Sequence, residues 1–321
     1  MPNHFYVASH TQDGGIFHFV LDDSGNFQFR ERVSIAQPSY LCIEGNSLYA
    51  LLREPFRMQS GVIAYEISND GQLLEKSSIR PTHGAVAAHL ISVDDRIYVA
   101  NYLSGSVVLL PDRAVIYPGS GPNSSRQECS HPHCIGLSPD KQLICIADLG
   151  TDSLWTHSLD LTFRSRTALP PGCGPRHFVF SDDGKFIYCI TELSSTVEVL
   201  QRQDNEFTHR ASYSALPDHC TIKSHGAAIR LSSCGQYLYV SNRGHNSIST
   251  FSVDADSLHF LCNTPCEGIS PRDFVICGDF LLCANELSNN IAIFYLDHGL
   301  PVFTGRSIDV DTPWGIVHAT F

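Results

Sequence analysis

The sequence predicts an all-β fold, a seven-bladed β-propeller with four-stranded blades, and three observations support this prediction. First, a strand–turn–strand unit rich in Val, Ile, Phe and Tyr recurs along the chain. Second, a polar residue closes the second strand of successive units at Asn101, Asp148, Glu192, Asn242 and Asn285, with spacings of 47, 44, 50 and 43 residues. Third, the sequence contains no long helical pattern. A period in the forties with about four strands per repeat is typical of a propeller blade.

Six complete units follow one another, and two half units flank them. The complete units are PSYLCIEGNSLYALLREPFRMQSGVIAYEI, AAHLISVDDRIYVANYLSGSVVLL, HPHCIGLSPDKQLICIADLGTDSLWTHSL, GCGPRHFVFSDDGKFIYCITELSSTVEVL, HGAAIRLSSCGQYLYVSNRGHNSISTFSV and PRDFVICGDFLLCANELSNNIAIFYL. We expect Gly315–Phe321 to supply the inner strand of one further blade and Phe5–Val20 to supply the rest of it. Sharing a blade in this way closes the ring and hides edge strands that would otherwise promote aggregation.

Strand-like segments between the units, such as Leu73–Ile79 and Phe207–Tyr213, are expected to be the outer strands of their blades. The chain shows no domain linker and no low-complexity tract. Residues 1–321 are therefore predicted to form a single propeller domain.

The unit from Gly172 to Leu200 illustrates how such a hairpin brings charges together. Two predicted strands, 177–181 and 185–191, are joined by an Asp-Asp-Gly turn. A hairpin returns the chain to the side that it left. Arg176, before the first strand, and Glu192, after the second, should therefore lie close together, either as a structural salt bridge or as part of an active site.

The same argument, applied to every blade, gathers polar residues on one face of the ring around the central channel. These residues are His133 and Asp148, then Arg176, His177 and Glu192, then His225 and Arg243, then Arg272, Asn285 and Glu286, with Arg53 and Asn101 as further candidates. Guanidinium groups recognise carboxylate or phosphate through paired hydrogen bonds. We therefore expect a small anionic ligand at this face.

Composition excludes several other classes of partner. The formal net charge is −12 and the chain contains four Lys, which argues against nucleic-acid or anionic-membrane binding. The start of the sequence shows no secretory signal, and no apolar run approaches the roughly 18–20 residues of a membrane span. Many of the twelve Cys lie within predicted strands, where they serve as small core residues. These features favour a reduced, cytoplasmic protein, expected to be a monomer or a weak homodimer.

No metal and no cofactor are predicted. The chain has no CxxC pair, and the Cys129/Cys134 and Cys262/Cys266 spacings do not suit zinc. No Gly-rich phosphate loop or dinucleotide fingerprint fits an all-β context. No Gly-x-Ser-x-Gly motif is present, which disfavours a covalent acyl-enzyme.

Four stretches give the chain a family resemblance: HPHCIGLSPD with IADLGTD, GPRHFVFSDDGKFIYCITELSSTVEV, GAAIRLSSCGQYLYVSNRGHNSISTF and SPRDFVI. In this order and spacing they resemble the seven-bladed lactonase family, over nearly the whole chain. That family includes a bacterial type of 6-phosphogluconolactonase and the fungal carboxy-cis,cis-muconate lactonising enzyme. The recurring Trp-Asp pairs of WD repeats are absent.

The resemblance implies a catalytic set at His133, Glu192, Arg176 and Arg243, and a reaction in which 6-phosphogluconolactone is hydrolysed to 6-phosphogluconate. Lactone hydrolysis needs a base that activates water and positive groups that stabilise the oxyanion. Either Glu192 or His133 could be the base. The expected substrate contacts are His177, His225, Arg272, Asp148 and Glu286.

Other interpretations remain open from the sequence. The same cluster would serve a muconate cycloisomerase, and a propeller can also be a non-catalytic binding scaffold. Asp148 and the three Asn of the repeat can simply stabilise turns.

Overall fold

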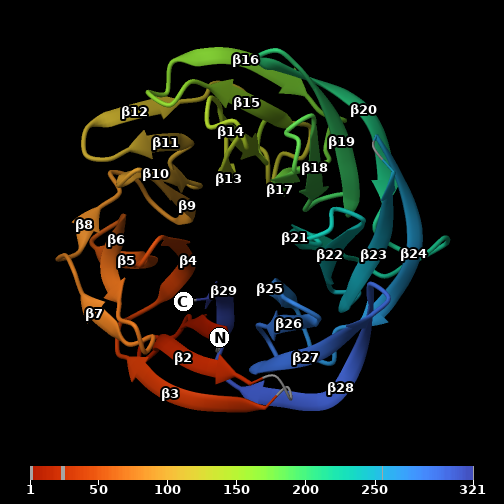
Figure 1. Ribbon diagram of the computed structural model, residues 1–321. Coiled ribbons are helices and arrows are strands. Elements are labelled where there is room, and N and C mark those ends of the chain that lie inside the picture. Colours follow the sequence, from red (N-terminus) through yellow and green to blue (C-terminus); the bar gives the residue numbers. More distant parts are fainter. Residues whose placement is uncertain (1–2, 23–25, 255, 321) are drawn as a thin grey trace.

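A computed structural model describes residues 3–22, 26–254 and 256–320. Seven antiparallel sheets surround a central axis, as Figure 1 shows, which confirms the predicted all-β seven-bladed propeller. All secondary-structure elements of the described residues are β-strands. These residues contain no helix long and apolar enough to cross a membrane.

The innermost strand of each sheet lies next to the axis, and the innermost strands of neighbouring blades contact each other around the whole ring. The inner strands are β29 (Pro313–Thr320), β4 (Pro38–Glu44), β9 (Ala87–Val93), β13 (Pro132–Leu137), β17 (Pro175–Phe180), β21 (His225–Leu231) and β25 (Pro271–Cys277).

The second strands are β1 (Asn3–Ser9), β5 (Ser47–Phe56), β10 (Arg96–Asn101), β14 (Ile144–Asp148), β18 (Phe186–Thr191), β22 (Tyr237–Arg243) and β26 (Phe280–Asn285). The third strands are β2 (Gly15–Leu21), β6 (Gln59–Ile67), β11 (Ser106–Leu109), β15 (Ser153–His157), β19 (Thr196–Gln203), β23 (Ser247–Asp254) and β27 (Asn290–Asp297). The outer strands are β3 (Phe27–Val33), β7 (Leu73–Glu75) with β8 (Arg80–Pro81), β12 (Arg113–Ile116), β16 (Phe163–Ala168), β20 (Glu206–Ser214), β24 (Ser257–Pro265) and β28 (Leu300–Asp309).

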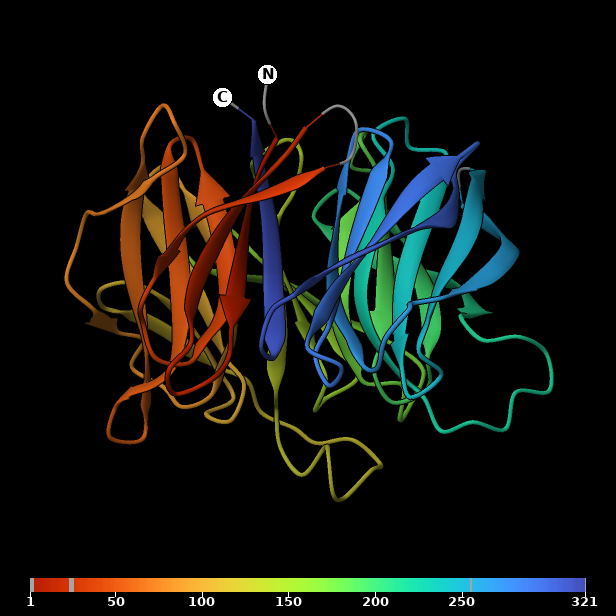
Figure 2. The same cartoon turned by 90° about the horizontal axis from the view of Figure 1, so that it is seen from below.

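The ring closes through the two ends of the chain, as predicted. Strand β29 pairs with β1, and the order β29-β1-β2-β3 makes one blade from residues about 300 positions apart. In Figure 2 both β1 and β29 run along the ring axis side by side. This pairing covers both edges of β1 and makes β29 the inner strand of the blade.

One predicted outer strand is wrong in part. Leu73–Ile79 was expected to be an outer strand, but only its first three residues form one, as β7, and the short strand β8 follows beyond its end; both pair with β6. At the break the Ser77 hydroxyl accepts a hydrogen bond from the amide of Ala64, in place of a backbone carbonyl. Outer strand β20, in contrast, covers all of the predicted segment 207–213.

The hydrophobic core consists of seven clusters among the described residues, each between two neighbouring sheets. Fully buried tyrosines connect the blades through polar contacts as well. Tyr6, Tyr98 and Tyr239 each donate a hydrogen bond to a loop carbonyl about 60 residues further along the chain, at 2.6–2.8 Å. A buried phenol needs such an acceptor, so these contacts link neighbouring blades as well. Cys145, Cys189 and Cys283 are fully buried, as the sequence predicts.

Buried histidines make the stability of this fold dependent on pH. Burial lowers the pKa of His18 to about 4 and that of His89 to about 3, from 6.5. The unfolded chain therefore binds more protons than the native protein below pH 6.5. We expect the free energy of unfolding to fall between pH 6.5 and pH 5, by up to about 1.4 kcal/mol per pH unit for each histidine.

Urea unfolding at pH 7, 6 and 5 measures this slope. The variant His18→Asn removes one of the two groups and should show a shallower slope. A free energy that stays level or rises as the pH falls from 6.5 to 5 would contradict the prediction.

Candidate active site

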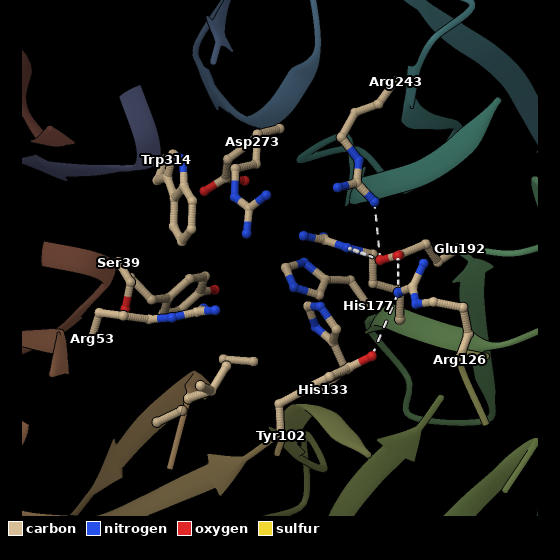
Figure 3. Close-up of a pocket in the computed structure, with 16 residues that line it drawn as sticks. Ser39, Arg53, Tyr102, Arg126, His133, His177, Glu192, Arg243, Asp273 and Trp314 are labelled. Carbon is tan, nitrogen blue, oxygen red and sulfur yellow. Dashed lines mark hydrogen bonds and ion pairs between the residues drawn. The ribbon is translucent and has the colours of Figure 1, made fainter. Parts of the chain in front are cut away.

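A pocket of about 390 Å³ opens on the ring axis, and all seven blades contribute to its wall. Its lining is strongly cationic, since it includes five arginines against two carboxylates. The lining residues are Ser39, Tyr40, Arg53, Val86, Ala87, Ala88, Tyr102, Arg126, His133, Arg176, His177, Glu192, Arg243, Arg272, Asp273 and Trp314. Figure 3 shows His133 and His177 between Glu192 on one side and Arg53 and Trp314 on the other.

A repeated backbone irregularity directs side chains into this pocket. In six inner strands the pairing with the second strand skips one residue, which is the mark of a β-bulge. The skipped residues are Ser39, Ala88, His133, Arg176, Arg272 and Trp314, and every one of them lines the pocket. A bulge turns a side chain out of the regular alternation, here toward the axis.

Proline precedes the skipped residue in five of these six strands. Proline has no amide hydrogen to donate to a ladder, so it is tolerated at the first residue of a strand or at a bulge. A Pro-x dipeptide at the start of an inner strand is therefore the sequence signal for a pocket-facing residue. Two instances, Pro175-Arg176 and Pro271-Arg272, already recur visibly in the sequence; the other three precede Ser39, His133 and Trp314.

Glu192 is the centre of an ion-pair network. Its carboxylate accepts from Arg176 Nε at 3.1 Å, from Arg243 Nη2 at 3.0 Å and from Arg126 Nη2 at 2.5 Å. Burial alone would raise the pKa of Glu192, but Arg243 and Arg176 hold it well below its usual range. The predicted Arg176–Glu192 pair exists, therefore, and it forms part of the pocket wall instead of a bridge remote from any site.

Arg176 is itself 3% exposed. Burial and the neighbouring Arg243 lower its pKa, while Glu192 opposes that change. Its Nη1 donates to the carbonyl of Ala227 at 2.7 Å, which ties the guanidinium to the next blade. This arrangement presents a fixed positive charge to the pocket with little freedom to move.

His133 and His177 form a buried imidazole pair, with ring centroids 5.2 Å apart. Burial and the charge of Arg176 hold the pKa of both rings well below 6.5, so both are neutral near pH 7. In the described part of the chain, Nδ1 of His133 and Nε2 of His177 have no hydrogen-bond partner. Because His133 also lines the pocket, its neutral ring can accept a proton from a bound water.

Three predicted substrate contacts do not line the pocket. The fully buried carboxylate of Asp148 accepts hydrogen bonds from the His131 and Gly150 amides and from Ser130, Thr151 and Trp155. These contacts use the capacity of both oxygens, so Asp148 stabilises its turn, which was the alternative that the sequence left open.

Glu286 lies behind Arg272, with Oε2 at 3.4 Å from Nη1 of that arginine and 3.1 Å from the Ser270 hydroxyl. It therefore orients a pocket residue instead of facing the pocket.

His225 begins β21, pairs in register with Arg243, and is likewise not part of the lining. Asn101 and Asn285, candidates for the same face, are fully buried and donate to backbone carbonyls.

Sequence reasoning missed Arg126, Tyr102, Trp314 and Asp273. Arg126 lies between β12 and β13, in the longest of the described connections from one blade to the next, so its position could not be aligned with the repeat. Figure 2 shows this connection (yellow) projecting from one end of the ring. Trp314 could have been predicted from the sequence, because a proline precedes it at the start of an inner strand.

A cationic pocket that holds neutral imidazoles beside a buried carboxylate is suited to binding a small anionic molecule. The family model described as Lactonase, 7-bladed beta-propeller, matches residues 4–318. The chain therefore belongs to the family of seven-bladed β-propeller lactonases.

Individual relatives agree with this membership. The chain is 34% identical over 337 aligned positions to the 6-phosphogluconolactonase of Bacillus subtilis, covering 97% of this chain and 96% of that protein. Its fold is similar to that of the periplasmic gluconolactonase of Pseudomonas aeruginosa, with a TM-score of 0.91, 25% identity and coverage of 100% and 99% of the two chains. A protein from Lactobacillus plantarum matches with a TM-score of 0.92 and 26% identity over the full length of both chains.

Proposed function

We propose that this lactonase hydrolyses 6-phosphogluconolactone to 6-phosphogluconate in the pocket around His133. The observation that carries the proposal is the neutral His133 imidazole, which lines the pocket beside Arg176 and the Glu192 network. The name of the Bacillus subtilis relative supports the choice of lactone. A cationic wall also suits a substrate with a phosphate group.

His133 is the general base in this proposal. It takes a proton from water as the water oxygen bonds to the lactone carbonyl carbon, which produces a tetrahedral oxyanion. Arg176 and Arg243 stabilise this oxyanion as its charge develops. The ring C–O bond then breaks, and the imidazolium of His133 returns the proton to the departing ring oxygen. The products are the free hydroxyl and a carboxylic acid, which then loses its proton to solvent and becomes the carboxylate.

Glu192 has a different role in this scheme, although the sequence left it as a possible base. A carboxylate that accepts from three guanidinium groups has a low pKa and little affinity for a further proton. It instead fixes the positions of Arg126, Arg176 and Arg243 around the reacting carbonyl. The neutral ring of His133, which lines the pocket, is the better proton acceptor.

The direct test follows the loss of freshly prepared 6-phosphogluconolactone with purified protein, corrected for spontaneous hydrolysis. No acceleration above the spontaneous rate would exclude the proposed reaction. Turnover of a carboxylated muconate with no effect on the sugar lactone would assign the site to a cycloisomerase instead.

The pH dependence of kcat/KM provides a further prediction. His133 acts as a base only when neutral, and burial together with Arg176 lowers its pKa below 6.5. Activity should therefore be level near neutral pH and fall only well below pH 6.5, as the ring becomes protonated. An acid limb centred at or above pH 6.5 would contradict this assignment. Initial rates measured against a no-enzyme control at each pH give the profile.

A further inference from the structure

The positive charges of the pocket fall into two groups. Arg126, Arg176 and Arg243 share the carboxylate of Glu192. Arg53 and Arg272 contact a different feature, the indole of Trp314, with their guanidinium carbons 5.6 Å and 3.8 Å from its ring. The second group lies across the pocket from the first, since Figure 3 shows Arg53 and Trp314 opposite Glu192 and Arg243.

The second group has excess positive charge. Within the residues that the structure describes, Arg53 forms no ion pair, and Arg272 has one contact with Glu286 at 3.4 Å, the long end of hydrogen bonding. Asp273, the carboxylate that also lines this part of the pocket, is already satisfied. It pairs with Arg230 at 2.7 Å and accepts from the Ile316 amide. It therefore leaves the charge of Arg53 and Arg272 available to a ligand.

Trp314 holds this pair in place. His10 stacks on its indole with ring centroids 3.5 Å apart and an interplanar angle of 15°. Arg272 lies nearly as close, so the imidazole and the guanidinium must occupy opposite faces of the indole. Burial lowers the pKa of His10 to about 4, and Arg53 and Arg272 contribute to that change. The neutral imidazole thus supports the indole and adds no competing charge.

We propose that Arg53 and Arg272 form a subsite for the phosphate of a phosphorylated lactone, while the lactone carbonyl lies at His133 and Arg176. This inference rests on the proposed function and identifies what selects its substrate. Two guanidinium groups suit a phosphate dianion, because each can donate two parallel hydrogen bonds to its oxygens. The carbonyl carbon and the carbon that bears the phosphate-carrying arm lie on either side of the ring oxygen of such a lactone, so that two separate arginine groups can contact the carbonyl and the phosphate.

The test compares two substrates, 6-phosphogluconolactone and unphosphorylated glucono-δ-lactone, in Arg53→Gln and Arg272→Gln. Each change should lower kcat/KM for the phosphorylated lactone by about 10–100-fold, the range expected for a lost hydrogen bond to a charged group. For the unphosphorylated lactone kcat/KM should stay within about threefold of the wild-type value, because it makes no contact with the subsite. Arg164→Gln, an exposed change on β16, is the matched control and should alter neither.

Equal losses on both lactones would overturn the subsite and leave the proposed hydrolysis intact. If the wild type hydrolyses neither lactone, the proposed reaction fails, and calorimetric titration with inorganic phosphate still decides the subsite. Binding weakened at least tenfold by Arg53→Gln, but not by Arg164→Gln, supports it, and unchanged binding overturns it. If Arg272→Gln does not fold, Arg272→Lys replaces it in the same test. Lysine keeps the charge beside Trp314 but cannot donate the paired hydrogen bonds of a guanidinium.

Discussion

Replacement of His133 by Asn is expected to lower kcat for lactone hydrolysis by about 10²–10⁴-fold, the contribution usual for a positioned general base. Asn cannot take up the proton that water releases, whereas the neutral imidazole of His133 lines the pocket and can accept it. The loss should appear in kcat more than in KM, because the base acts in the transition state. Steady-state kinetics at saturating lactone provide the measurement.

His298→Asn is the matched control, since this histidine has a side chain that is 96% exposed, and the change should leave kcat unaltered. The pH dependence of kcat/KM separates the loss of a base from a packing defect, because a packing defect would not change the position of the acid limb. The acid limb of the wild type should be absent from the residual activity of His133→Asn. If that limb persists unchanged, another group is the base and the assignment to His133 is wrong.

Glu192→Gln is expected to reduce the free energy of unfolding by about 3 kcal/mol and kcat by at least about 10²-fold. The amide cannot neutralise the three guanidinium groups that now share one carboxylate, and Arg176 is almost fully buried. The arginines then repel one another and leave the positions that stabilise the oxyanion. Urea unfolding and steady-state kinetics measure the two effects.

A third readout separates this role from that of a base. The uncompensated guanidinium groups of Glu192→Gln should bind inorganic phosphate more tightly than the wild type does, as titration calorimetry can measure. Glu192→Asp keeps the charge and should recover part of the stability. If Glu192→Gln is as stable as the wild type, binds phosphate equally and loses only the acid limb, Glu192 is the base.

The repeat made the fold predictable from the sequence. The alternation of strands, the turn residues and the polar residue after each second strand are local signals, and a period in the forties restricts them to propeller blades. Pairing of the two half units was predictable too, because an open ring would expose strand edges. The one failure, at Leu73–Ile79, depends on a serine hydroxyl that replaces a carbonyl in the ladder.

The site was predictable only where it follows the repeat. His133, Arg176, His177, Glu192, Arg243 and Arg272 flank the strands of successive hairpins, and all of them line the pocket. Asp148 occupies an equivalent position but is used by its own turn. Sequence position alone cannot separate these cases, because the direction of a side chain depends on whether a bulge or a local hydrogen bond turns it.

The sequence by itself therefore determined the seven-bladed ring, the blade shared by the two ends, and the face on which Arg, His and carboxylate gather. Only the tertiary structure decided how those charges are partitioned. Arg126 reaches Glu192 from a connection that belongs to no repeat, and Trp314 brings Arg53 and Arg272 together from different blades. The reason is physical: local patterns specify strands and turns, whereas the pKa of a buried group depends on charges that folding brings within a few ångströms of it.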